Sequence, residues 1–194
     1  AGLDTYEANV ALGRGEDERD YTAAAQMLLA LGADRVRLLS NNPAKARVVS
    51  EPIDEMSGIV KSRRRANLYW VHNDSGNPAE VYLVDEKLNI RMTCKLKGVK
   101  NRDWEDIAAG PGPDENKKYV YVADIGDNNA RHALKHIYRF EEPVLADGIG
   151  DTTIESFEKI SFQLEDGKKD TEAMMIHPKT KSIYIVSKRE KPVV

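Results

Sequence analysis

Hydrophobic positions near the start of the chain recur with the period of a helix. The run YTAAAQMLLALG from Tyr21 carries its apolar side chains at the i, i+3, i+4 and i+7 spacing, on one helical face: Ala24, Met27, Leu28 and Leu31. Asp20 suits the N-cap of this helix and Gly32 suits its C-terminal stop. Apolar residues at 36–39 then supply a short strand, so the pattern predicts a short α/β segment.

From about Ser50 the pattern changes to short apolar runs separated by Gly, Asn, Asp and Pro. Such runs are typical of antiparallel strands joined by tight turns. The clearest predicted strands are Leu68–His72, Glu80–Val84, Tyr119–Ala123, His136–Phe140 and Ser182–Ser187. We therefore expect a mixed chain, in which the short α/β segment precedes a mainly antiparallel β domain.

A strand-turn-strand unit recurs in this second part, beginning at Met56, Trp104 and Thr171. A D-x-G-[ND] element follows its second strand at 74–77 and 124–127, where glycine permits positive φ and the acids cap the turn. With two further strands, each unit approximates a four-stranded propeller blade, and about two and a half blades fit the chain. The pattern predicts a propeller-like partial domain that cannot close its ring within one copy.

Acidic residues recur at matching places in these units. Asp74 and Asp124 follow the second strands, while Glu105 and Glu172 lie near the starts of the second and third units. In a propeller such residues could face the central channel and bind calcium, which prefers oxygen ligands. We prefer turn capping, because one arc of a ring brings few oxygens together.

The composition limits the kinds of binding partner that we expect. The 194 residues are 41% hydrophobic and 31% charged, with a net charge of −3, and neither a nucleic acid nor a membrane partner is expected. Cys94 is the only cysteine, so one copy can form neither a disulfide framework nor a multi-cysteine zinc site. Its surroundings, IRMTCKLKG, predict a strand with a buried structural thiol. The N-terminus lacks the basic and apolar regions of an export signal.

The first part carries GLDTYEANVALG, then EDERD, then LLSNNPAKA. In order and spacing these motifs resemble the C-terminal catalytic region of GTP cyclohydrolase II, the zinc enzyme that commits GTP to riboflavin synthesis. The resemblance spans Gly2 to Ala46, and we take 1–46 as the first domain.

The resemblance implies roles for five residues. Asp17 matches the family's proton acceptor, and Arg19 matches the arginine proposed as nucleophile toward the α-phosphate of GTP. Positions that bind GTP in the family correspond to Thr5, Ser40 and Lys45. A guanidinium beside a carboxylate suits this chemistry, because it holds phosphate oxygens in a planar fork.

The resemblance also implies a zinc ion, which the family holds with cysteines that precede the region represented here. Those ligands are absent from this chain, and no residue in it is assigned to a metal. We therefore expect the chain alone not to open the imidazole ring of GTP with release of formate and pyrophosphate. A separate polypeptide or an oligomer could complete the zinc site.

The second part resembles the N-terminal part of a bacterial β-propeller-like family that is usually exported. The resemblance rests on SGIVKSRRRANLYWVHNDSGNPAEVYLVD, WEDIAAGP and ADIGDN, and it covers 51–194, the second domain. It implies a fold but no reaction.

Two alternatives to the enzyme therefore stay open. One is a binding or scaffolding module of unknown ligand, and the other is a junction at 46–50 that places two unrelated coding pieces end to end. The first part implies a cytoplasmic location, which we adopt. The second part implies a secreted or periplasmic one.

Overall fold

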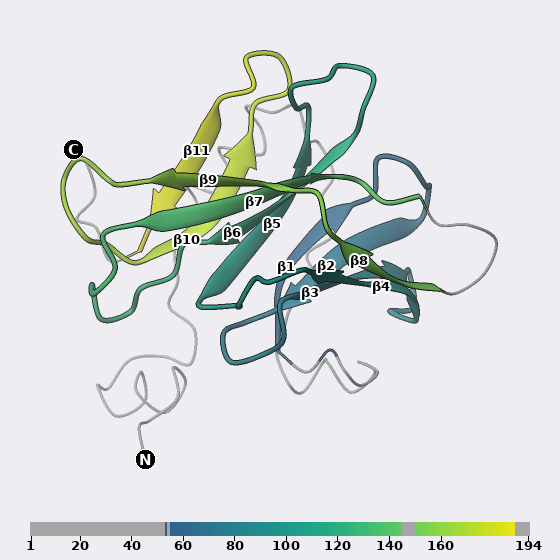
Figure 1. Cartoon of the computed structure of the whole chain (residues 1–194), viewed down its shortest axis with the longest axis horizontal. Coiled ribbons are helices and arrows are strands. Elements are labelled where there is room, and N and C mark those ends of the chain that lie inside the picture. Colours follow the sequence, from purple (N-terminus) through teal and green to yellow (C-terminus); the bar gives the residue numbers. More distant parts are fainter. Residues whose placement is uncertain (1–52, 54, 145–149, 189–194) are drawn as a thin grey trace, which may run out of the picture. The chain divides into compact units, whose positions relative to one another are not determined.

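The computed structural model describes residues 53, 55–144 and 150–188. Three predictions concern residues outside this range. They are the helix and strand at 20–39, the GTP-site residues, and the junction at 46–50. The described ranges hold β-strands and no helix, so they contain no helix able to cross a membrane. Figure 1 shows the strands grouped into separate sheets. The prediction of a mainly β second part is confirmed.

The first sheet begins as an up-and-down meander. Its antiparallel strands are β1 (Met56–Lys61), β2 (Leu68–Asn73), β3 (Glu80–Asp85) and β4 (Ile90–Leu96). The turn after β3 is held by Asp85, whose Oδ1 accepts hydrogen bonds from the backbone N–H groups of Lys87 and Asn89. Such local side-chain bonding explains why the apolar run ends at Asp85 and the chain reverses.

The second sheet repeats this arrangement. Its antiparallel strands are β5 (Trp104–Gly110), β6 (Tyr119–Asp124), β7 (Lys135–Glu141) and β9 (Glu158–Phe162). A third hairpin pairs β10 (Thr171–Ile176) with β11 (Ile183–Ser187). The five predicted strands and the three predicted hairpins are confirmed, with ends that differ by a residue or two. The propeller ring stays a prediction.

One strand departs from the simple repeat. After β7 the chain contributes β8 (Gly150–Ile154) to the first sheet, parallel to β4, before it returns to the second sheet as β9. Figure 1 shows β8 beside β4, away from its neighbours in sequence. The side chain of Ile154 joins the core cluster that contains Leu96 of β4. The first sheet therefore gains a fifth strand.

The principal core lies between the two larger sheets. Trp70 and Leu83 from the first sheet share one buried cluster with Trp104 and Tyr138 from the second. Burial of such side chains stabilises the fold by about 1.5–3 kcal/mol each. Strand β1 packs against β5, and β5 packs against β10, so the first strands of the three hairpins are neighbours.

Cys94 of β4 is fully buried in this core, as its sequence context predicted. Burial among apolar groups raises the pKa of its thiol to about 12, because the thiolate loses its hydration. The side chain acts as a small hydrophobic group.

Candidate functional site

The same irregularity marks the first strand of each hairpin. In β5 the pairing with β6 passes from Trp104 to Asp106, and in β10 the pairing with β11 passes from Thr171 to Ala173. The skipped residues are Glu105 and Glu172, and Ser57 is skipped in the same way in β1. A bulge of this kind changes the direction of one side chain, and bulges are frequent beside functional sites.

Five carboxylates lie close together beside two of these bulges. Oxygens of Asp74, Asp103 and Glu105 lie within 4.8 Å of one another, and so do oxygens of Glu105, Asp170 and Glu172. We call these five residues the acidic cluster. Glu105 belongs to both groups and is therefore its centre.

Asn101 holds Asp74 beside the start of β5. Its side-chain amide donates to the backbone carbonyl of Asp74 at 2.7 Å, and its Oδ1 accepts from the N–H of Trp104 at 3.1 Å. One side chain thus joins the loop after β2 to the strand that carries Glu105. The amide also donates to the carbonyl of Asn73 at 3.3 Å.

The loop after β6 is tied to the start of β10. The N–H of Asp127 donates to Asp170 Oδ1 at 2.8 Å, and the Thr171 hydroxyl donates to the Ile125 carbonyl at 2.6 Å. Between these anchors, a Cβ added to Gly126 would collide with Glu105 Oε1 and the Asp103 carboxyl group. A side chain at residue 126 would therefore displace these two carboxyl groups from their positions.

This reason differs from the one predicted from the D-x-G-[ND] element. Gly76, in the first copy of the element, does have positive φ, at 84°. Gly126 is not among the described residues with positive φ, so the prediction is wrong for the second copy. There the glycine leaves space for the carboxyl groups of Glu105 and Asp103.

The centre of the acidic cluster is electrostatically unfavourable for a carboxylate. Burial raises the pKa of Glu105 to about 8, and the negative charges of Glu172, Asp74, Asp103 and Asp170 add to the effect. The pKa of Asp103 is also raised, first by burial and then by Asp74. Lys188 pairs with the cluster from one side, with its Nζ 2.8 Å from Glu172 Oε1 and 3.8 Å from Asp170 Oδ2.

Turn capping accounts for some of the recurring acids but not for all. Asp74 accepts a hydrogen bond from the N–H of Ser75, and Asp124 accepts one from the N–H of Asp103 and pairs with Arg102. Glu105 and Glu172 are not turn caps, since both lie in bulges within strands. Asp124 is outside the acidic cluster, because Arg102 occupies its carboxylate.

Asp103 and Asp170 were not singled out from the sequence. A signal was present, because D-x-E occurs at 103–105 and again at 170–172, both times at the start of a repeated unit. In the first unit the corresponding residues are Glu55 and Ser57. Comparing the three copies position by position would have found both aspartates.

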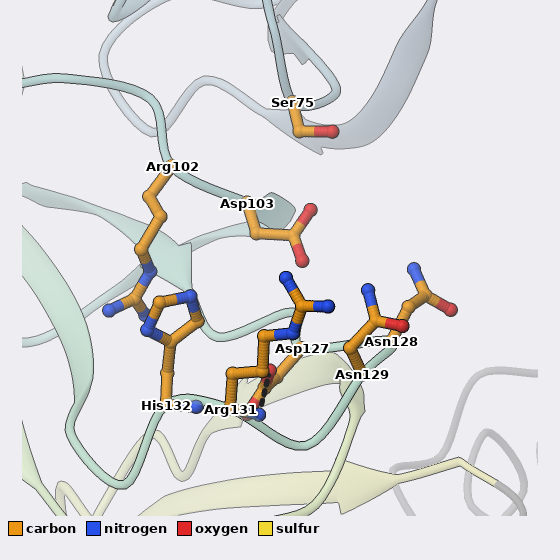
Figure 2. A pocket seen from close by; sticks show the side chains of 8 residues that line it. All are labelled: Ser75, Arg102, Asp103, Asp127, Asn128, Asn129, Arg131 and His132. Carbon is orange, nitrogen blue, oxygen red and sulfur yellow. Dashed lines mark hydrogen bonds between the residues drawn. The ribbon is translucent and has the colours of Figure 1, made fainter.

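A polar pocket of about 310 Å³ adjoins the acidic cluster through Asp103 (Figure 2). Its wall is formed largely by the loop between β6 and β7, with basic and amide side chains: Asn128, Asn129, Arg131 and His132. Asp127 shapes this loop by accepting hydrogen bonds from the N–H groups of Arg131 and His132. These bonds lower the pKa of Asp127 although its partial burial acts in the opposite direction.

The residues predicted to bind and process GTP, namely Thr5, Asp17, Arg19, Ser40 and Lys45, lie outside the described residues. The described part does not fit the zinc site of the resembled enzyme. Its clusters of metal-binding side chains contain only carboxylates, and Cys94 is buried in the core.

Comparison with known proteins finds a family for the first part of the chain. Residues 1–52 match the GTP cyclohydrolase II family. This supports the family resemblance stated for the first part. No solved structure matches the chain.

The individual relatives carry the name GTP cyclohydrolase-2. The protein of Vibrio cholerae is 58% identical over 59 residues, which are 30% of this chain and 30% of the relative. The protein of Xylella fastidiosa is 64% identical over 62 residues, which are 32% of this chain and 15% of the relative. The chain thus spans under a third of the length of these relatives.

Proposed function

We propose that the first part supplies the phosphate-binding side of a GTP cyclohydrolase II site. The observation that carries this proposal is the family match over residues 1–52, with relatives 58% identical over about the same length. In it, Arg19 holds the α-phosphate and acts as nucleophile, and Asp17 accepts a proton. Thr5, Ser40 and Lys45 bind GTP.

The same proposal leaves the chain without ring-opening activity of its own. The resembled enzyme uses zinc held by cysteines, and Cys94 is the only cysteine among the 194 residues. Its side chain is fully buried and its pKa is raised to about 12, which disfavours the thiolate that zinc requires. We expect GTP binding without release of formate.

Titration calorimetry with GTP, together with a formate assay in the presence of zinc, tests this proposal. Loss of a charge-assisted contact costs about 1.5–3 kcal/mol, so Arg19→Ala should weaken GTP binding by roughly 10- to 100-fold. Arg91→Ala, on strand β4, is the matched control and should bind GTP as the unaltered chain does.

The two claims of the proposal, GTP binding and the absence of formate release, are tested separately. Absence of any GTP binding would contradict the phosphate-binding role. Formate release that disappears in Arg19→Ala would contradict the predicted inactivity, because it would require a metal site that the chain's cysteine content does not suggest.

We also propose a second candidate function, in which residues 51–194 form part of a propeller-like binding or scaffolding domain. The supporting observation is the repetition of a four-stranded antiparallel unit, with the first strands of successive hairpins packed against one another. If a second copy completes the partial ring, light scattering should give twice the chain mass of 21.7 kDa. A monomeric mass would contradict completion by self-association.

A further inference from the structure

Glu105 lies at the centre of the acidic cluster and is largely buried. The residue is 9% exposed, and among the described residues its carboxylate neither accepts a hydrogen bond nor forms an ion pair. A buried carboxylate that lacks both is costly, so native proteins almost always pair such a group or bind a metal with it. The acidic cluster contains a group whose expected partner is missing.

Asp170 shows the same deficiency on the other side of the cluster. The residue is 7% exposed, and its Oδ2 has no hydrogen-bond partner, although its Oδ1 accepts from the N–H of Asp127. Lys188 Nζ is 3.8 Å from Oδ2 and closer to Glu172, and Lys135 also interacts electrostatically with Asp170. Among the described residues, these two ammonium groups lie near a cluster of five acidic side chains.

The oxygen spacing fits a large hard cation. Calcium binds oxygen at about 2.3–2.6 Å, so two of its ligands can be up to about 5 Å apart. The limit of 4.8 Å within each group of three carboxylates lies inside this range. Magnesium usually keeps several waters and binds through one or two carboxylates, so a cluster made of protein carboxylates suits calcium better. Zinc is disfavoured because neither group contains histidine or cysteine.

From this geometry we propose that the acidic cluster is a calcium-binding site centred on Glu105. Asp74 and Asp103 bind from one side, and Asp170 and Glu172 bind from the other. The two bulges that direct Glu105 and Glu172 out of the strand pairing are what bring the sides together. The site uses none of the residues proposed to bind GTP.

The backbone at Gly126 leaves room for two of these acids. Its missing side chain leaves the space that Glu105 Oε1 and the Asp103 carboxyl group occupy. The N–H of Gly126 donates to the backbone carbonyl of Asp103 at 3.1 Å, which fixes the loop against the start of β5. The backbone thus holds two like-charged side chains near each other, an arrangement that a cation would stabilise.

Calorimetry on the full chain tests the proposal, after removal of metals with EDTA and dialysis. Calcium should bind and raise the thermal midpoint measured by tryptophan emission, because a ligand that binds only the folded state stabilises it. Glu105→Gln retains the shape of the side chain and should weaken calcium binding at least 10-fold. Glu86→Gln, on the exposed turn after β3, makes the same chemical change and should bind calcium normally.

Each other outcome has a definite meaning. Absence of calcium binding by the unaltered chain, or unchanged binding by Glu105→Gln, would overturn the proposal, as would binding of zinc alone. If Glu105→Gln fails to fold, Glu172→Gln replaces it, since Glu172 is only partly buried. Arg19→Ala should bind calcium as the unaltered chain does, and this separates the result from any failure of the GTP proposal.

Discussion

His72 should make the described β structure sensitive to acid. Its side chain is fully buried against Trp104, with ring centroids 5.8 Å apart. The Nδ1 atom lies 2.8 Å from the carbonyl of Asn73 and donates to it, while Nε2 has no partner. Burial lowers the pKa of His72 from 6.5 to about 4, because a charged imidazolium would lose its hydration there.

The direction of the effect follows from the two protonation states. Below pH 6.5 the unfolded chain binds a proton at His72, whereas the folded chain does not do so until about pH 4. The contribution is therefore complete above pH 6.5 and is lost as the pH falls toward 4. At 1.36 kcal/mol per pKa unit, the loss approaches about 3 kcal/mol.

Urea unfolding between pH 4 and pH 7.5, followed by tryptophan emission, measures this loss. Trp70 and Trp104 are the only tryptophans in the chain, and both are buried in the principal core. His72→Gln removes the titrating group, so the difference in unfolding free energy between this variant and the unaltered chain should shrink by about 3 kcal/mol from pH 7.5 to pH 4.

The two proteins share all other titrating groups, so the contributions of those groups to the unfolding free energy cancel in this difference. His132→Gln is the matched control because it makes the same chemical change at an exposed position. If the His72→Gln difference were independent of pH, the reasoning from burial to acid sensitivity would be refuted.

Two further predictions concern close packing and thiol burial. A Cβ at Gly58 would lie 2.6 Å from His72 Nε2 and 2.9 Å from the backbone nitrogen of Ile107, so Gly58→Ala should lower the urea unfolding free energy by about 1–3 kcal/mol. Gly150→Ala, where a Cβ meets nothing within 4 Å, should leave that free energy nearly unchanged, and equal losses in the two variants would contradict the packing argument. Cys94, with its raised pKa of about 12, should react with a thiol reagent only at urea concentrations that unfold the core, and rapid labelling in buffer would show that the first sheet opens locally.

The strands of the second part could be predicted because their signals are local. Alternating apolar residues and turn-forming Gly, Asn and Asp mark each strand and its end, and these features need no distant partner. The pairing of β8 with β4, which adds a strand to the first sheet, could not be predicted in this way. Its parallel pairing joins Cys94 to Thr152, far apart in the chain, and the run at 150–154 carries only one large apolar residue, Ile154.

The candidate site was predictable only in part, for a related reason. Repeating acids were visible, but whether an acid caps a turn or faces its neighbours depends on bulges and on the arrangement of separate strands. Asp124 shows the difference. It occupies the same position in its unit as Asp74 does, but its carboxylate forms an ion pair with Arg102. The GTP-site assignments rested on motifs alone and stay predictions.

The contrast between satisfied and unsatisfied acids is the strongest argument that the cluster serves a ligand. Asp74 and Asp127 accept backbone hydrogen bonds that shape their loops, so their presence follows from folding. Glu105 accepts none among the described residues, and burial without a partner opposes folding. A glutamine would fill the same space without a charge. A carboxylate in this bulge is therefore better explained by the proposed cation than by a purely structural role.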